Sequence, residues 1–269
     1  MKIALCFSGH IRDLDVTKNY WLHYIHKYNM DVYGSFWDVE NEELGDTIEN
    51  FKNTYNPKKI EVENYDAFRE TTQSFTSLQI NSPATLAPQF RETSKQFGQV
   101  SMWYKIWRCN MLTKSEKTPY DLVIRCRTDV FLDEKFEIQQ NDMLNVPMGF
   151  NHGPWVGSEG INDCFAYGIP KIMDYYSYLF LHVMDYHGKG HYLFPPEHFL
   201  AVHMSKIKVQ IRYFPNYMMI TRRSKGQPME VYNKFINEPF ESFRWSDSIE
   251  FIPDPNGDFR QELKENFRI

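Results

Sequence analysis

The first third of the chain alternates short apolar runs with stretches whose apolar residues recur at helical spacing. The apolar runs predict strands over 2–7, 31–37 and 59–63, and the spaced patterns predict helices over 14–28 and 44–55. In the first helix, Leu14, Trp21, Leu22 and Ile25 form one apolar stripe. Strands that alternate with helices in this way predict a mostly parallel, doubly wound sheet, which is an α/β fold.

The rest of the chain continues this pattern after an interruption. Residues 70–96 are rich in Thr, Ser, Gln and Pro without periodicity, which predicts a long loop. The patterns that follow predict helices over 99–115, 169–184 and 196–207 and strands over 121–130 and 209–214. After about residue 221 the sequence is polar and irregular, and we expect this tail to wrap around the domain.

The strand predicted over 121–130 changes from apolar to charged residues at its end. Arg125, Arg127 and Asp129 lie two residues apart, so a continuous strand would place them on one face. Arginine binds phosphate through paired hydrogen bonds, and a carboxylate is a ligand for a hard divalent cation. This pattern indicates a site for a phosphate and a metal. The alternative is a structural ion pair between Arg127 and Asp129 at the strand end.

The loop after the first strand is a second candidate for ligand binding. Gly9 permits close approach of the backbone, Ser8 offers a hydroxyl group and Arg12 can reach a phosphate. The loop matches neither the dinucleotide-binding nor the P-loop motif, and a simple turn with an exposed Arg12 is the alternative. Trp37, at the end of the second strand, can stack on a base or a sugar, although its local pattern favours a place in the core.

Two carboxylates in the second half are candidates for acid–base chemistry. Asp163 precedes an apolar segment and fits an exposed, oriented general base, although Asp at such a position is also a common cap. Glu197 lies in the first turn of a predicted helix, where the helix dipole favours it. Its alternative role is to bind an acceptor hydroxyl group.

Composition narrows the protein class further. The chain has 30 Lys and Arg against 35 Asp and Glu, a net charge of −5, and no long basic run, which argues against a nucleic-acid partner. The opening apolar run is too short for a signal peptide, and no segment approaches the roughly 20 apolar residues of a membrane helix. We therefore expect a cytoplasmic protein without a membrane span. Its four cysteines form no C-x-x-C pair, and we expect buried, reduced thiols.

Several of these segments, taken in order, resemble a known enzyme family. The matching segments are 3–12, 31–38, 101–107, 120–129 and 162–168. Together they resemble small glycosyltransferases of the GT-A fold, of the kind encoded by large algal DNA viruses and bacterial surface-polysaccharide clusters. The resemblance implies a single GT-A-like, Rossmann-like domain. Its nucleotide-sugar-binding half would cover about 1–132, its acceptor half about 133–222 and its tail 223–269.

The resemblance also implies roles for individual residues. It implies a nucleotide-sugar donor, with UDP expected, and a glycan acceptor. Asp129 would hold Mn²⁺ or Mg²⁺, although Arg127 stands where the family's Asp-x-Asp motif has its first Asp. Donor contacts would come from Ser8, Gly9, Arg12, Lys105, Arg125 and Arg127. Asp163 would be the base of an inverting transfer. A carbohydrate-binding module on a degenerate transferase scaffold and a sugar nucleotidyltransferase are the alternatives, and the second fits the 8–12 loop poorly.

Overall fold

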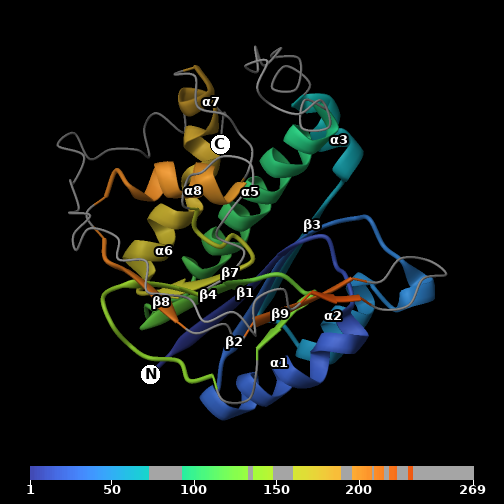
Figure 1. Cartoon of the computed structure of the whole chain (residues 1–269). Helices are drawn as coiled ribbons and strands as arrows, with labels where there is room; N and C mark the ends of the chain where they lie inside the picture. The colour runs from blue at the N-terminus through green and yellow to red at the C-terminus, as the bar shows by residue number, and fades with distance from the viewer. Residues whose placement is uncertain are drawn as a thin grey trace.

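The computed structural model (Figure 1) describes residues 1–72, 93–132, 136–147, 160–188, 196–207, 209–214, 218–222 and 230–232. These residues form one domain in which helices cover both faces of a central sheet (Figure 1). The predicted α/β fold class, with a mostly parallel sheet, is therefore confirmed. The proposed division into halves stays a prediction, and most of the tail from 223 lies outside the described residues.

The central sheet has seven strands in the order β3-β2-β1-β4-β7-β6-β8. They are β1 (Ile3–Gly9), β2 (Asp31–Trp37), β3 (Lys59–Glu63), β4 (Leu122–Cys126), β6 (Leu144–Pro147), β7 (Phe165–Gly168) and β8 (Ile211–Phe214). Of these strands, only β7 runs antiparallel to its neighbours. A second sheet contains β5 (Val130–Leu132), β9 (Met218–Arg222) and β10 (Glu230–Tyr232) in the order β10-β9-β5.

The helices divide between the two faces of the central sheet (Figure 1). One face is covered by α1 (Leu14–Tyr28) and α2 (Ile48–Tyr55), and the other by α5 (Thr93–Thr113), α6 (Pro170–Ser177), α7 (Leu179–Gly188) and α8 (Pro196–Met204). A short helix, η1 (Glu42–Leu44), precedes α2, and α3 (Tyr65–Thr71) follows β3. Within the described residues, no helix has the length and apolar character needed to cross a membrane.

The period of two along β1 and β4 decides which side chains face which helices. Cys6 belongs to the core under α5, whereas Phe7 belongs to the core under α1. On β4, Val123 and Ile124 divide in the same way. All four cysteines are buried and unpaired, as expected.

Several predicted elements have different bounds in the structure. The strand predicted over 121–130 is wrong beyond Cys126, because the chain turns at Arg127–Asp129 before β5 begins. The helices predicted over 44–55 and 169–184 are each broken into two. The helix predicted from residue 99 begins at Thr93, and α3 occupies the start of the predicted loop. Residues 73–92 of that loop lie outside the described residues.

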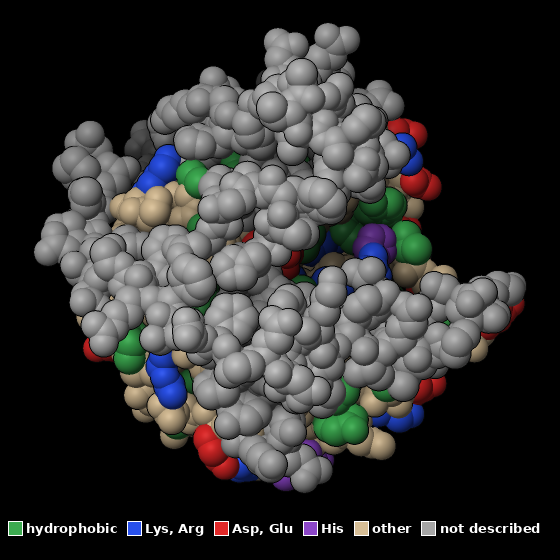
Figure 2. All heavy atoms as spheres, in the orientation of Figure 1, with side chains coloured by type: hydrophobic (Ala, Val, Ile, Leu, Met, Phe, Trp, Pro, Cys, Tyr) green, Lys and Arg blue, Asp and Glu red, His purple; other side chains and the backbone are tan. Residues whose placement is uncertain are grey.

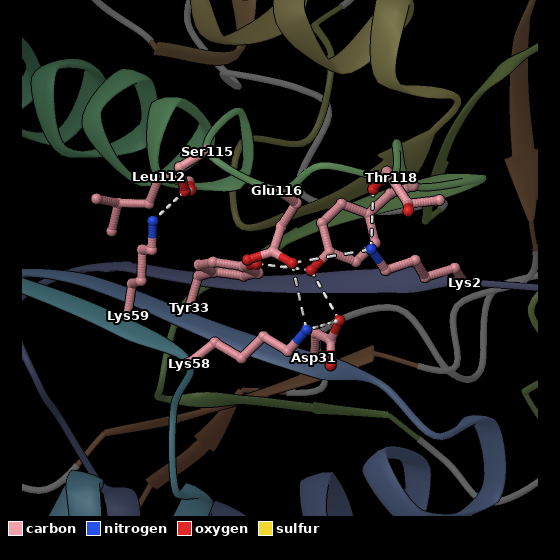
Figure 3. Close-up of polar contacts among 10 residues, drawn as sticks. Lys2, Asp31, Tyr33, Lys58, Lys59, Leu112, Ser115, Glu116 and Thr118 are labelled. Carbon is pink, nitrogen blue, oxygen red and sulfur yellow. Dashed lines mark hydrogen bonds and ion pairs between the residues drawn. The ribbon is translucent and has the colours of Figure 1, made fainter.

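The amino-terminal edge of the parallel strands carries a closed polar network (Figure 3). Lys58 contacts Asp31 at 2.7 Å and Glu116 at 3.4 Å, and Lys2 donates to the Thr118 carbonyl at 2.8 Å. Tyr120 donates to Asp31 at 2.8 Å. These acids and bases satisfy one another, so this edge serves to fasten the starts of the strands to the end of α5.

Candidate functional site

The candidate site lies at the opposite, carboxyl-terminal edge of the sheet. From β1 the chain proceeds to β2 and β3 on one side, while β4 lies on the other side of β1. Ligands of open α/β sheets bind at such a point, where the strand order reverses. The loops that follow β1 and β4 meet there, because the Arg12 backbone N–H donates to Thr128 Oγ1 at 2.8 Å. We call this region the carboxyl-edge site.

Gly9 gives the first loop its shape. Its φ of +110° is a conformation that side chains rarely permit, so the turn out of β1 requires glycine. A Cβ atom built at this residue would meet nothing within 4 Å. The backbone here therefore borders open space, and the ligand contact expected from the sequence stays a prediction.

Cationic groups converge around His10 in the same loop. Burial lowers the pKa of His10, and together with the charges of Arg12, Arg127 and Lys105 it brings this pKa to about 4. His10 is consequently neutral at pH 7, and three cations act at one point, from the loops after β1 and β4 and from α5. Figure 2 shows a hollow in which Lys or Arg, His and acidic side chains are visible together. This concentration of positive charge suits an anionic ligand.

Asp129 is held by Arg127 in a paired ion contact. Arg127 Nε donates to Asp129 Oδ1 at 2.8 Å, and Arg127 Nη2 donates to Asp129 Oδ2. Only 2% of the Asp129 side chain is exposed. This is the structural ion pair that the sequence left open as the alternative to a metal ligand. Arg127 also contacts Cys164 Sγ through Nη1 at 3.4 Å, which connects it to the start of β7.

The residues present do not fit a divalent cation in this arrangement. Both carboxylate oxygens of Asp129 are bound by Arg127, so neither points to an open coordination position. Within the described residues, no group of three or more His, Cys, Asp or Glu side chains is arranged to hold a metal. A cation at Asp129 would first have to displace Arg127.

Lys105 is a buried member of the site. Its side chain is 0% exposed, so Lys105 is not a surface lysine. Lys105 Nζ contacts Glu63 Oε2 at 2.6 Å and lies 4.2 Å from the centre of the Trp37 ring. Burial lowers the pKa of Lys105, whereas the Glu63 carboxylate raises it. Lys105 is therefore a buried positive charge of the site. Trp37 is only 1% exposed, so it is a core residue, which was the alternative to a stacking role.

Asp163 reaches this edge because β7 runs antiparallel beside β4. Cys126, at the end of β4, pairs with Phe165, at the start of β7. Asn162 provides the cap of this segment, since its Oδ1 accepts from the N–H groups of Cys164 and Phe165 at 2.9 and 3.2 Å. Asp163 is thus not the cap. It is only 5% exposed, however, so the expectation of an exposed carboxylate is wrong.

Glu197 is a second carboxylate near Asp163. The backbone N–H of Ile161 donates to the Glu197 carbonyl at 2.9 Å, which joins the start of α8 to the segment before Asp163. Burial raises the pKa of Glu197 to about 8, and the negative charge of Asp163 contributes to the shift. Glu197 therefore carries a proton at pH 7. A protonated carboxyl group near a second carboxyl group is a common arrangement in acid–base catalysis.

Arg125 and Ser8 do not join the carboxyl-edge site. Both line a small internal cavity under α5 and α6, together with Asn110 and Tyr176. Arg125 is 3% exposed, and its guanidinium finds no hydrogen-bond partner among the residues that the structure describes. The prediction that Arg125, Arg127 and Asp129 share one face is wrong, because the strand ends after Cys126.

The structure therefore brings together most, but not all, of the sequence-predicted site residues. The carboxyl-edge site is formed by Gly9, Arg12, Lys105, Arg127, Asp129 and Asp163. Sequence reasoning assigned no site role to His10, although it lies inside the 8–12 loop, and it left Glu197 undecided. The sequence signal for Glu197 was a carboxylate directly after two prolines at a helix start.

Comparisons with known proteins do not extend this description. No protein-family model matches the chain, and no curated protein sequence matches it significantly.

Proposed function

We propose that this protein is a glycosyltransferase that moves a sugar from a nucleoside diphosphate donor, with UDP expected, to a glycan hydroxyl group. One observation carries the proposal: the positive charges of Arg12, Arg127 and Lys105 lie close together. The carboxyl groups of Asp163 and Glu197 lie beside them. This arrangement occurs where open α/β sheets bind ligands. The resemblance in segment order supports the same reaction class.

In the proposed mechanism the donor diphosphate lies against the Gly9 backbone, where no side chain intervenes. The acceptor oxygen attacks the anomeric carbon as the bond to the diphosphate oxygen breaks. Asp163 takes the proton from the acceptor hydroxyl group, and the sugar inverts. The cations around His10 stabilise the charge that develops on the leaving diphosphate. Glu197, protonated at pH 7, donates a hydrogen bond to the acceptor.

Metal dependence is the part of the proposal that the site residues support least. A bound Mn²⁺ or Mg²⁺ would supply further charge stabilisation for the leaving diphosphate. Because Arg127 occupies both oxygens of Asp129, we assign this stabilisation to the cationic side chains instead. Donor hydrolysis that persists in EDTA would support this assignment, whereas complete loss would return Asp129 to the role of metal ligand.

The test is hydrolysis of a panel of UDP- and GDP-sugars with Mn²⁺, with Mg²⁺ and with EDTA. Asp163→Asn should abolish turnover and leave donor binding, measured by calorimetry, unchanged. The matched control is Asp66→Asn on the exposed face of α3, which should retain full activity. Near-normal turnover by Asp163→Asn would remove this residue from the mechanism.

A carbohydrate-binding module is the second candidate function. The observation that favours it is the closed Arg127–Asp129 pair, which offers no free carboxylate to a metal. Such a module would bind a glycan without hydrolysing any donor. Glycan binding by the wild-type protein, combined with no turnover across the panel, would select this candidate.

A further inference from the structure

The interior beneath α5 and α6 contains polar groups that the described residues leave without hydrogen-bond partners. In this part of the chain, Arg125 Nε, Nη1 and Nη2 have no such partner, and the same holds for Ser8 Oγ, Asn110 Oδ1 and Tyr176 OH. These four residues come from β1, β4, α5 and α6, and all are less than 5% exposed. All four line one cavity with a volume of about 10 Å³.

Lys105 and Arg127 have carboxylate partners, whereas Arg125 has none among the described residues. Lys105 contacts Glu63 at 2.6 Å, and Arg127 contacts Asp129 at 2.8 Å. A buried guanidinium without a counter-charge is costly, since burial removes its hydration and nothing replaces it. The apolar lining residues Ile106, Val123 and Met173 lower the local dielectric and increase that cost. A negatively charged occupant of the cavity would compensate the charge of Arg125 and remove this cost.

We propose that this cavity binds a single monatomic anion, which is chloride under ordinary conditions. A cavity of this size admits one water-sized particle and is too small for a phosphate or sulfate group. The guanidinium and the hydroxyl groups of Ser8 and Tyr176 can all donate to the anion. Asn110 uses its amide nitrogen on Asp174 and Ser177, and its Oδ1 can accept a remaining guanidinium N–H.

The same geometry reassigns two residues of the proposed donor site. Ser8 and Arg125 are expected from sequence to contact the donor phosphate, yet both face the α5 side of the sheet. The anion site is thus separate from the carboxyl-edge site and does not depend on the proposed transferase activity. A protein with no transferase activity would still bind the anion.

The first experiment is a crystal structure of the wild-type protein grown in sodium bromide, with anomalous data collected at the bromine edge. An anomalous peak within hydrogen-bond distance of the Arg125 guanidinium is the expected result. A water molecule there, with no anomalous signal, would overturn the proposal.

The second experiment measures the thermal midpoint while chloride or bromide replaces gluconate at constant ionic strength. Binding only to the folded state should raise Tm by roughly 5 °C when the halide exceeds its Kd a hundredfold. Arg125→Met should abolish this halide dependence, and Ser8→Ala should weaken it. Lys27→Met, a change of an exposed cation, should leave it intact. A Tm that is independent of halide in the wild type, or equally dependent in Arg125→Met, would overturn the proposal.

Discussion

The Arg127–Asp129 ion pair makes a quantitative prediction about stability. Replacing Asp129 by Asn keeps the side-chain shape but leaves the Arg127 guanidinium without its counter-charge. Removing one partner of a buried pair costs about 3–5 kcal/mol. Because 20% of the Arg127 side chain is exposed, water screens part of the loss, and we expect a value near the lower end. A loss of about 3 kcal/mol corresponds to a Tm decrease of roughly 6–9 °C.

The assay is urea unfolding followed by tryptophan fluorescence, applied to a double-mutant cycle. The cycle comprises the wild type, Asp129→Asn, Arg127→Met and the double variant. We expect the double variant to be more stable than Asp129→Asn, since it contains no unpaired guanidinium. Single effects that add to within about 0.5 kcal/mol would refute the pairing.

A metal titration tests the functional side of the same pair. If Arg127 holds both oxygens of Asp129, Mn²⁺ should leave the Tm of the wild type unchanged. A Mn²⁺-dependent increase in Tm that Asp129→Asn removes would show that the carboxylate leaves Arg127 to bind metal. That result would refute the reasoning from the ion pair and restore the metal assignment.

Three further predictions concern individual side chains. The pKa of Glu197 is about 8 in the folded protein and 4.5 in the unfolded chain, so its contribution to stability is complete below pH 4.5 and is lost as the pH rises through 8. Glu197→Gln should flatten this part of the profile of unfolding free energy against pH. An unchanged profile would contradict the raised pKa. Glu63→Gln leaves the Lys105 charge unpaired, and Lys105→Met leaves the Glu63 charge unpaired. The side chain of Lys105 is 0% exposed and that of Glu63 is 33% exposed, so Glu63→Gln should lower Tm more. The reverse order in thermal unfolding would contradict this argument. Gly9→Ala should lower the free energy of unfolding, measured in urea, by about 1–3 kcal/mol, because a side chain strains the backbone at φ +110°. The control Gly98→Ala, in helix α5, should be neutral or stabilising. Equal effects of the two variants would contradict the strain argument.

Local sequence patterns predicted three regular elements of the first third with accurate bounds. The helix over 14–28 and the strands over 31–37 and 59–63 have the predicted bounds in the structure. Hydrophobic periodicity is a local property, and these elements bury one face or stripe that the period reveals. Their alternation was also sufficient to predict the α/β class.

The sequence also identified most residues of the carboxyl-edge site, because a charge directly after a buried strand is conspicuous. Arg12, Arg127 and Asp129 stand out for this reason, whereas Gly9 stands out because it permits close approach of the backbone. Their arrangement was less predictable. A period of two placed Arg125 beside Arg127, but the turn after Cys126 separates them. That turn depends on distant groups, since the Thr128 carbonyl accepts from Thr17 Oγ1 at 2.6 Å.

The tertiary structure alone decided which distant residues meet. Asp163 lies beside the end of β4 because β7 enters the sheet antiparallel, and Lys105 finds its carboxylate partner on β3, in Glu63. The Arg125 cavity likewise joins four elements that no local pattern connects. The sequence by itself determined the elements, the fold class and the candidate charges. Strand pairing and helix packing decided their partners, because those contacts depend on the whole chain being folded.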